Sequence, residues 1–399
     1  MPDPKIPRPG GDSTRAVHGG EREGRPRVSD ALSTPIVQTS TFWFRDTQEV
    51  IDYQEGRHPS YEYGRYGNPT TQAAAEKLRQ LEGGETCVAA ATGMAAITTL
   101  LLALVPRNGH IVTTTDCYRR TRQFVATVLP KLGIETTVVE PSDIAALERA
   151  LDRETALFFS ESPTNPYLRV IDIPRVAGLC HARGAQVVID ATFATPINQR
   201  PLELGADVVI HSGTKYLAGH NDVMAGALVG NTEVLAPVRE LLGILGSVLD
   251  PHAAYLLLRG MKSLALRVDR ANAKASAIAL HLDRHPKIER VHYPGLESHP
   301  QHEIARAQMS GFGGVVSFEV VPDFEATSKF VDALQIPYIA PSFGGCESLV
   351  EQPAVVSYWD KSPEERAQLG IKDNLVRYAC GVEDAEDLIA DLDQALDRI

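Results

Sequence analysis

The sequence predicts an α/β protein built on a largely parallel sheet with helices on both faces. From Gly83 onward, short apolar runs of strand length alternate with helical patterns, which is typical of parallel sheets. Polar residues of distinctive chemistry follow several of these runs, and ligands of such sheets bind at the carboxyl ends of the strands. The chain has 399 residues, 43% of them hydrophobic, which is enough for two packed domains.

The alternation can be followed along the chain. Extended runs are expected at 87–91, 111–115, 136–139, 157–160, 186–190 and 208–211, with helices at 94–105, 144–151 and 173–183. A long helical pattern over 253–285, interrupted at Gly260, leads into a second region. That region has extended runs at 315–320 and 375–380 and helices at 324–334 and 385–399, which indicates a smaller α+β domain. The predicted division is an N-terminal tail and arm (1–60), a large domain (61–255) and a C-terminal domain (256–399).

The composition disfavours several classes of partner. A formal charge of −12 and a pI near 5.5 argue against nucleic acids and anionic membranes. The five cysteines form no CxxC pair and no zinc spacing, so we expect reduced thiols, a cytoplasmic location and no metal site. The longest apolar run, 87–105, approaches the length of a membrane span, but Thr92 and Gly93 interrupt it and favour strand–turn–helix. Residues 1–11 contain no apolar core, so a tail is expected there rather than a signal peptide.

Lys215 is the first candidate catalytic residue. It follows the apolar run 206–210, and hydroxyl side chains precede it at Ser212 and Thr214. An amine can condense with an aldehyde and small hydroxyls can hold a phosphate, and pyridoxal phosphate offers both groups. Taken alone, the pattern fits a surface lysine about as well.

Asp190 strengthens this interpretation, because it closes the apolar run 187–189 about 25 residues before Lys215. A carboxylate buried at a strand end needs a cationic partner. In a pyridoxal enzyme that partner is the ring nitrogen, which the carboxylate keeps protonated. The alternative is a helix-capping aspartate just beyond a strand.

Six spaced motifs carry a family resemblance from about Ser13 to the end of the chain. They lie at 61–70 (YEYGRYGNPT), 91–94 (ATGM), 161–166 (ESPTNP), 187–193 (VVIDATF), 211–220 (HSGTKYLAGH) and 374–377 (NLVR). In these motifs and their order the chain resembles the pyridoxal-phosphate enzymes of cysteine and methionine metabolism. The runs 115–122 (TDCYRRTR), 338–347 (YIAPSFGGCE) and 357–360 (SYWD) are most similar to the plant-type cystathionine γ-synthases. The resemblance implies the pyridoxal-phosphate-dependent transferase fold type I with a seven-stranded, mostly parallel sheet. It also implies an N-terminal arm that reaches a neighbouring subunit, in a homotetramer built of active dimers.

The resemblance also assigns cofactor contacts. It implies that Gly93 and Met94, at a strand-to-helix turn, bind the phosphate together with Ser212 and Thr214. Further implied contacts are Tyr118 stacking on the ring and moving protons, Asn165 near the ring oxygen and the substrate carboxylate, and Tyr63 and Arg65 reaching the phosphate of the adjacent subunit. Each of these residues also has a plain structural explanation in loop or turn packing. The family has Asn after the ring aspartate whereas this chain has Ala191, so a neighbouring polar contact is in question.

For the substrate, the resemblance implies that Arg377 binds the α-carboxylate and that Ser342 lies near the lysine. An ion pair of Arg377 with Glu383 or Asp384 is the alternative. Arg119 and Arg120, where most relatives have two glycines, suit an anionic distal group on homoserine, or equally a solvent-facing pair. Glu62 is a candidate for the amine of an incoming cysteine.

The expected reaction is γ-replacement, in which activated homoserine (O-phospho, O-succinyl or O-acetyl) and L-cysteine give L-cystathionine. Lys215 would take the Cα proton and then move one from Cβ, so that a group on Cγ leaves. Pro341 stands where many lyases and bacterial synthases have Glu, which weakens the case for cystathionine as a substrate to be cleaved. A cystathionine or methionine lyase, or a sulfhydrylase that uses sulfide or methanethiol, stays open.

Overall fold

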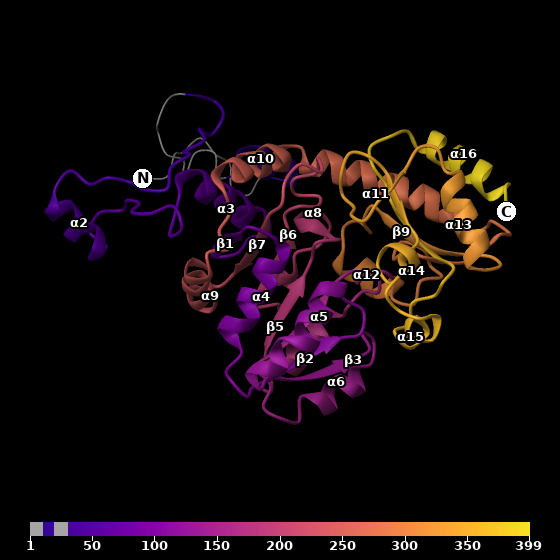
Figure 1. Cartoon of the computed structure of the whole chain (residues 1–399), viewed down its shortest axis with the longest axis horizontal. Coiled ribbons are helices and arrows are strands. Elements are labelled where there is room, and N and C mark those ends of the chain that lie inside the picture. The colour runs from indigo at the N-terminus through magenta and orange to yellow at the C-terminus, as the bar shows by residue number, and fades with distance from the viewer. Residues whose placement is uncertain (1–10, 20–30) are drawn as a thin grey trace.

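A computed structural model describes residues 11–19 and 31–399 of the chain. The predicted N-terminal tail, apart from Gly11, lies outside these residues. Two sheets organise the rest, one in each half of the chain, and Figure 1 shows them side by side with α11 (Leu264–Leu282) running from one toward the other. Within the described ranges, no helix is both long and apolar enough to cross a bilayer.

The large sheet has seven strands, as predicted. They are β1 (Thr86–Ala90), β2 (His110–Thr114), β3 (Glu135–Val139), β4 (Leu157–Glu161), β5 (Gln186–Asp190), β6 (Val208–Ser212) and β7 (Gly226–Gly230), in the order β1-β7-β6-β5-β4-β2-β3. The strands from β6 to β3 pair in parallel, whereas β7 is antiparallel to both β1 and β6. The predicted strands lie within one residue of the observed ones, and β7 was not predicted.

Both faces of this sheet are covered because the strands are apolar on both sides. Phe159 and Val188 face α4 (Gly93–Leu104) and α9 (Thr232–Leu245), while Phe158 and Ile189 face α6 (Ile144–Ala150) and α7 (Ile173–His181). The helices α3 (Pro69–Glu82) and α10 (Pro251–Lys262) pack against each other beside β1 and β7. This layering leaves the carboxyl ends of β4, β5 and β6 at one edge, where Glu161, Asp190 and Ser212 end their strands.

The predicted helix over 253–285 is two helices, α10 and α11, separated at Ser263. Gly260 does not break the helix. A Cβ there would lie 2.1 Å from the carbonyl oxygen of Ala218, so glycine allows α10 to pack against the loop after Lys215. The proposed domain boundary at 255/256 falls within α10 and stays a proposal.

The C-terminal region is a five-stranded sheet backed by helices. Its strands are β8 (Ile288–His292), β9 (Val315–Val320), β10 (Tyr338–Ile339), β11 (Leu349–Glu351) and β12 (Leu375–Ala379), in the order β10-β11-β12-β9-β8. The helices α11, α13 (Phe324–Ala333) and α16 (Ala385–Leu396) bury one face of it around Phe318 and Phe330. Three short helices complete the region: α12 (His302–Gln308), α14 (Pro353–Val356) and α15 (Pro363–Gln368).

The N-terminal arm holds two short helices that the sequence did not suggest, α1 (Asp12–His18) and α2 (Thr47–Gln54). Figure 1 shows α2 projecting away from the sheets at the end of a long extended segment. Trp43, in that segment, is 81% exposed, so the arm presents a large aromatic side chain to solvent in the single chain. Two more helices belong to the large sheet region: α8 (Thr195–Asn198), and α5 (Arg119–Thr127), which begins directly after Tyr118.

Candidate active site

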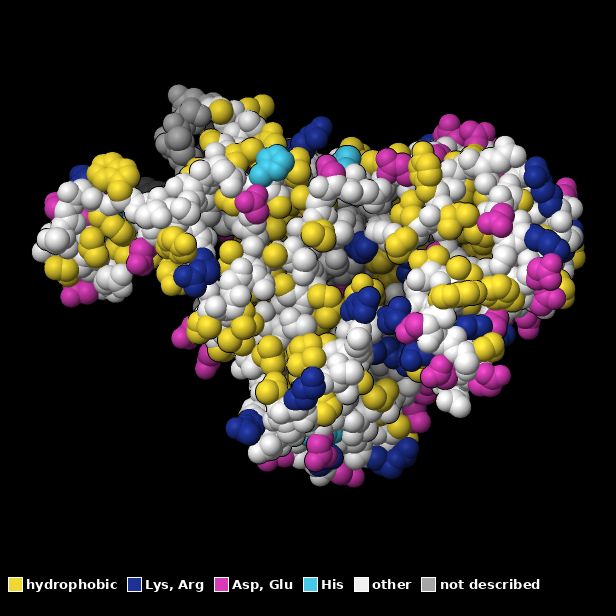
Figure 2. Space-filling model, in the orientation of Figure 1, with side chains coloured by type: hydrophobic (Ala, Val, Ile, Leu, Met, Phe, Trp, Pro, Cys, Tyr) yellow, Lys and Arg dark blue, Asp and Glu magenta, His cyan; other side chains and the backbone are white. Residues whose placement is uncertain are grey.

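A cavity of about 390 Å³ lies where the carboxyl ends of the large sheet's strands meet the C-terminal region. Figure 2 shows the surface hollowed between the two halves of the molecule, with Lys and Arg side chains beside the hollow. Residues from both halves line the cavity, namely Gly93, Met94, Tyr118, Arg119, Glu161, Asn165, Asp190, Thr192, Ser212, Thr214, Lys215, Pro341, Ser342, Phe343, Glu351 and Arg377. Eleven of the fifteen residues that the sequence singled out therefore meet here.

Lys215 lies in the turn after β6, and its amine contacts the C-terminal region. Lys215 Nζ is 2.7 Å from Ser342 Oγ and 5.2 Å from the centre of the Phe343 ring. Burial, followed by the charge of Arg377, lowers the pKa of Lys215 to about 8, against an opposing effect of Glu351. The amine is still mostly protonated at pH 7, but its neutral form, which attacks carbonyls and accepts protons, is far more accessible than in an exposed lysine.

Asp190 ends β5 with its side chain buried and held on one oxygen. Asp190 Oδ1 accepts hydrogen bonds from Thr192 N at 2.9 Å and Thr192 Oγ1 at 2.5 Å, and Thr192 Oγ1 accepts one from Ser212 N at 2.8 Å. Burial raises the pKa of Asp190, and the Thr192 bonds oppose that rise. Thr192, one residue after Ala191, therefore provides polar contacts to Asp190 in this chain.

The turn before α4 presents backbone amides to the cavity. Thr92 Oγ1 caps α4 by accepting from Ala95 N at 2.9 Å, which leaves the Gly93 and Met94 amides without intrahelical acceptors. A Cβ on Gly93 would lie 2.9 Å from Ser212 Cβ, so only glycine lets this turn approach the end of β6 so closely. Thr214 lines the same region, although its hydroxyl also exchanges hydrogen bonds with the backbone of Ala225 at 3.0 and 3.3 Å.

Tyr118 lies at the cavity wall and is 46% exposed. Its backbone amide donates to Glu161 Oε1 at 2.5 Å. Glu161 is the register partner of Asp190 across β4 and β5, and burial together with the charge of Asp190 raises its pKa well above the usual range. A buried glutamate therefore fixes the backbone that carries the tyrosine.

Arg377 on β12 is buried and held from three sides. Its Nη1 donates to Asn165 Oδ1 at 3.2 Å and lies 3.1 Å from Glu351 Oε1, and its Nη2 donates to the Ser342 carbonyl at 3.1 Å. The predicted alternative, an ion pair with Glu383 or Asp384, is not formed, because Glu383 bonds Ser348 and Asp384 bonds Arg270. Ser342 adopts φ +120°, a strained conformation for serine of the kind found at functional sites.

Arg119 and Arg120, the two arginines predicted to bind an anionic group, differ in position. Arg119 lines the cavity and forms an ion pair of 2.8 Å with Asp360 from the C-terminal region. Arg120 is exposed and bonds Gln123 at 2.7 Å, outside the cavity lining. The structure therefore brings Arg119 to the site and leaves Arg120 on the surface.

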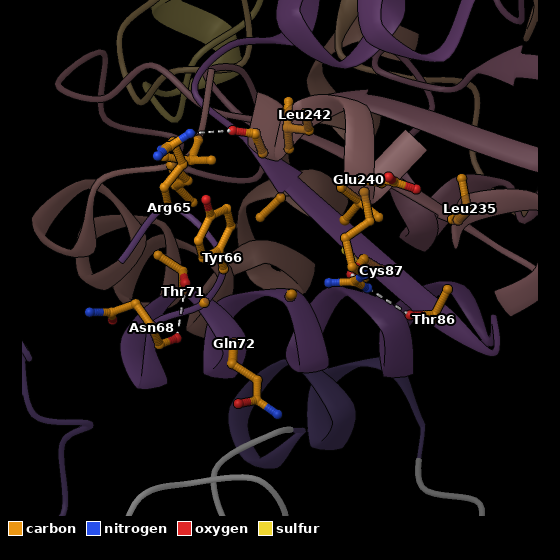
Figure 3. Close-up of a pocket in the computed structure, with 18 of the residues that line it drawn as sticks. Arg65, Tyr66, Asn68, Thr71, Gln72, Thr86, Cys87, Leu235, Glu240 and Leu242 are labelled. Carbon is orange, nitrogen blue, oxygen red and sulfur yellow. Dashed lines mark hydrogen bonds between the residues drawn. The ribbon is translucent and has the colours of Figure 1, made fainter. Parts of the chain in front are cut away.

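Glu62, Tyr63 and Arg65 lie apart from the Lys215 cavity. Glu62 and Arg65 line a second, open cavity of about 890 Å³, whose residues Figure 3 shows, with Arg65 and Tyr66 near Leu242 at one end. Arg65 donates to the Gly243 carbonyl at 3.1 Å and packs against the rings of Tyr63 and Tyr66. Within one chain these residues cannot complete the Lys215 site.

Sequence reasoning missed Glu161, Thr192, Phe343 and Glu351. The signal that identified Asp190, an acid closing an apolar run, is also present at Glu161 after 157–160 and at Glu351 after 349–350. The second run has only two residues, which is too short to predict a strand end.

The residues present fit pyridoxal phosphate. The Gly93 turn offers backbone amides and the Ser212 hydroxyl for a phosphate, Asp190 keeps Oδ2 outside the Thr192 contacts, and Lys215 supplies the amine. At the far end of the cavity, Arg377 Nε is buried without a partner among the described residues, as expected of a group that awaits a ligand.

The chain matches known proteins over nearly its whole length. The model of the family Cys/Met metabolism PLP-dependent enzyme matches residues 13–397. Cystathionine gamma-synthase 1, chloroplastic, of Nicotiana tabacum is 59% identical over 389 residues, 97% of this chain and 72% of that protein. L-methionine gamma-lyase of Pseudomonas putida is 41% identical over 394 residues, 98% of each chain.

The fold has equally close counterparts. Cystathionine gamma synthase from Xanthomonas oryzae pv. oryzae, solved in complex with aminoacrylate and cysteine, superposes with a TM-score of 0.92 at 36% identity over 98% of each chain. The predicted fold type and cofactor are confirmed. The chain belongs to the Cys/Met metabolism PLP-dependent enzyme family.

Proposed function

We propose that this protein is a cystathionine γ-synthase, which joins an activated homoserine to L-cysteine by γ-replacement and releases the activating group. The observation that carries the proposal is the 59% identity to a plant cystathionine gamma-synthase, against 41% to a methionine gamma-lyase over a similar length. Pro341 in the cavity wall, where many lyases and bacterial synthases have a glutamate, weakens the case for cleavage of cystathionine.

Bound pyridoxal phosphate supplies an electron sink for the electrons left on the substrate carbon when a proton is removed. Asp190, whose Oδ1 is engaged by Thr192, would hold the ring nitrogen in its protonated form. Gly93, Met94 and the Ser212 hydroxyl would hold the phosphate, and Tyr118 would pack on the ring. These roles of the chain's residues are part of the proposal.

Arg377 holds the substrate's α-carboxylate through Nε and the remaining Nη2 proton, which lie side by side on the planar guanidinium. Lys215, steered by Ser342, takes the proton from Cα and then moves a proton from Cβ, so that the group on Cγ leaves. Cysteine sulfur then attacks Cγ and loses its thiol proton, and protons return to Cβ and Cα, so that L-cystathionine and the protonated leaving group are the products. Arg119 pairs with the partly exposed Asp360 in the empty site. When substrate is bound, Arg119 leaves Asp360 and binds an anionic activating group such as a phosphate.

Initial rates with O-phospho-, O-succinyl- and O-acetyl-L-homoserine, each with and without L-cysteine, test the function. We expect L-cystathionine to form fastest from the phospho ester when cysteine is present. Release of 2-oxobutyrate at the same rate with and without cysteine, or from cystathionine itself, would establish the lyase alternative instead.

We also propose a homotetramer built of dimers in which Tyr63 and Arg65 of one subunit serve the partner's site. Their separation from the Lys215 cavity and the exposed arm around Trp43 support it. Mixing inactive Lys215→Ala and Arg65→Ala subunits should restore about a quarter of the wild-type activity, because half of randomly formed dimers are mixed and each has one intact site. Sites confined to one chain would regain nothing.

A cytoplasmic location is proposed for the same protein. All five cysteines are free thiols, four of them buried, which suits a reducing compartment. Cell fractionation with cytoplasmic and membrane markers would test this, and recovery in a secreted fraction would contradict it.

A further inference from the structure

Two cationic side chains share one small region of the active-site cavity. Ser342 contacts both, through its hydroxyl to Lys215 Nζ at 2.7 Å and through its carbonyl to Arg377 Nη2 at 3.1 Å. Both also lie against the Phe343 ring, at 5.2 Å for Lys215 Nζ and 5.6 Å for Arg377 Cζ. Two positive charges this close together repel each other. A nearby anion offsets that repulsion by attracting both of them.

Glu351 is the anion that the fold provides. It lies directly opposite Arg377 in the antiparallel ladder of β11 and β12, so the sheet register brings the two side chains together. Glu351 Oε1 is 3.1 Å from Arg377 Nη1, and the exposed fractions of the two side chains are only 2% and 6%. Asn165 and the Ser342 carbonyl also hold the guanidinium, but both are neutral.

The second oxygen of Glu351 gives independent support. Glu351 Oε2 is buried without a partner among the described residues, in a side chain that lines the cavity. A carboxylate placed only to brace Arg377 would be expected to use both oxygens on donors. An unpaired oxygen in a cavity that also holds two cations indicates that its charge is what matters there.

We propose that Glu351 is the resident counter-ion of Arg377, which weakens the attraction of Arg377 for the substrate carboxylate and balances the proton that Lys215 Nζ carries during the reaction. In the empty site Glu351 neutralises Arg377. With substrate bound, Arg377 and a protonated Lys215 give two positive charges, and Glu351 and the substrate carboxylate give two negative ones. The inference rests on the proposed function only in taking the ligand to be an α-amino acid.

The expected signature separates this role from a structural brace. Replacing Glu351 by Gln keeps the shape but removes the charge, so Arg377 should attract a carboxylate more strongly. We expect the Kd of the holoenzyme for L-2-aminobutyrate to fall about tenfold in Glu351→Gln, while kcat with the homoserine ester falls because protonated Lys215 loses its compensating charge. L-2-Aminobutyrate has the homoserine carbon skeleton with no group to expel, so its binding does not depend on which reaction the enzyme performs.

The controls follow from the same sheet. Glu319→Gln removes a buried carboxylate on β9, the strand on the other side of β12. Glu319 pairs with His292 at 2.8 Å and with Lys372, outside the cavity, so its loss should leave the Kd unchanged. Glu351→Asp, which withdraws the charge by one methylene, should tighten binding less than Glu351→Gln and serves also if the Gln variant is unstable. In an Arg377→Ala background, Glu351→Gln should not tighten binding.

Isothermal titration calorimetry measures the Kd of each holoenzyme for L-2-aminobutyrate and for propylamine, which lacks the carboxylate. Tightening for the amino acid alone, and only with Arg377 present, supports the counter-ion role. Weaker or unchanged amino-acid binding in both Glu351 variants would overturn it. Failure of the proposed synthase reaction would instead appear in the product assay, with these binding constants unaffected.

Discussion

Replacing Lys215 by Met should stabilise the cofactor-free protein at neutral pH, because the fold holds an ammonium group in a poorly solvated place. The pKa of Lys215 falls from 10.5 to about 8, with burial as the main cause. At about 1.4 kcal/mol for each unit of pKa, the protonated amine costs about 3 kcal/mol of folding free energy. Met also loses the Lys215–Ser342 hydrogen bond, worth about 1 kcal/mol, so a net gain of about 2 kcal/mol is expected.

The dependence on pH has a definite direction. Below pH 8 both the folded and the unfolded chain hold the Lys215 proton, so the full cost is present. Between about pH 8 and 10.5 the unfolded chain still holds the proton and the folded one has lost it, so the wild type gains stability as pH rises. The advantage of Lys215→Met should therefore be largest at pH 7 and should shrink toward pH 10.

Urea unfolding of the cofactor-free proteins at pH 7 and pH 10 measures this difference, and other titrating groups cancel between variant and wild type. Lys329→Met is the matched control, because the Lys329 side chain is 62% exposed and should show no such pH-dependent gap. A Lys215→Met protein that is less stable than wild type at pH 7, or a gap that stays constant with pH, would refute the reasoning.

Two further predictions concern the ends of the cavity. Gly226→Ala should weaken pyridoxal-phosphate affinity at least tenfold, because the new Cβ would lie 2.0 Å from the Thr92 carbonyl oxygen and displace the phosphate-binding turn. Equilibrium dialysis measures this affinity. Gly178→Ala, whose new Cβ would meet open space, is the control and should leave the affinity unchanged. Arg119→Ala should reduce the preference for the phospho over the acetyl ester of homoserine about tenfold in kcat/KM, whereas Arg120→Ala, outside the cavity lining, should change that ratio less. An unchanged ester preference in Arg119→Ala would show that another group reads the anion.

The sequence predicted the site best where a residue's neighbours in the chain reveal its surroundings. Asp190 closes the apolar run 187–189 and Lys215 comes five residues after the run 206–210, so these strand-like runs indicate positions at the carboxyl edge of a parallel sheet. The strand β7 was missed because its five residues, bounded by glycines, become a strand only through pairing with β1 and β6.

Residues whose role depends on a partner distant in the sequence could not be predicted. Glu351 forms its ion pair with Arg377, 26 positions later, only because the register of β11 and β12 places the two side chains opposite each other. Thr192 holds Asp190 through two hydrogen bonds, and these depend on the path of the chain after β5. Tyr63 and Arg65 can take their proposed roles only when a second subunit is present. Their positions in a single subunit therefore do not reveal those roles.

The product ratio from O-phospho-L-homoserine as L-cysteine is raised tests γ-replacement most directly. We expect L-cystathionine to displace 2-oxobutyrate as the main product, since both arise after the same loss of the group on Cγ and cysteine decides which one forms. A constant yield of 2-oxobutyrate with no L-cystathionine at any cysteine concentration would contradict the account.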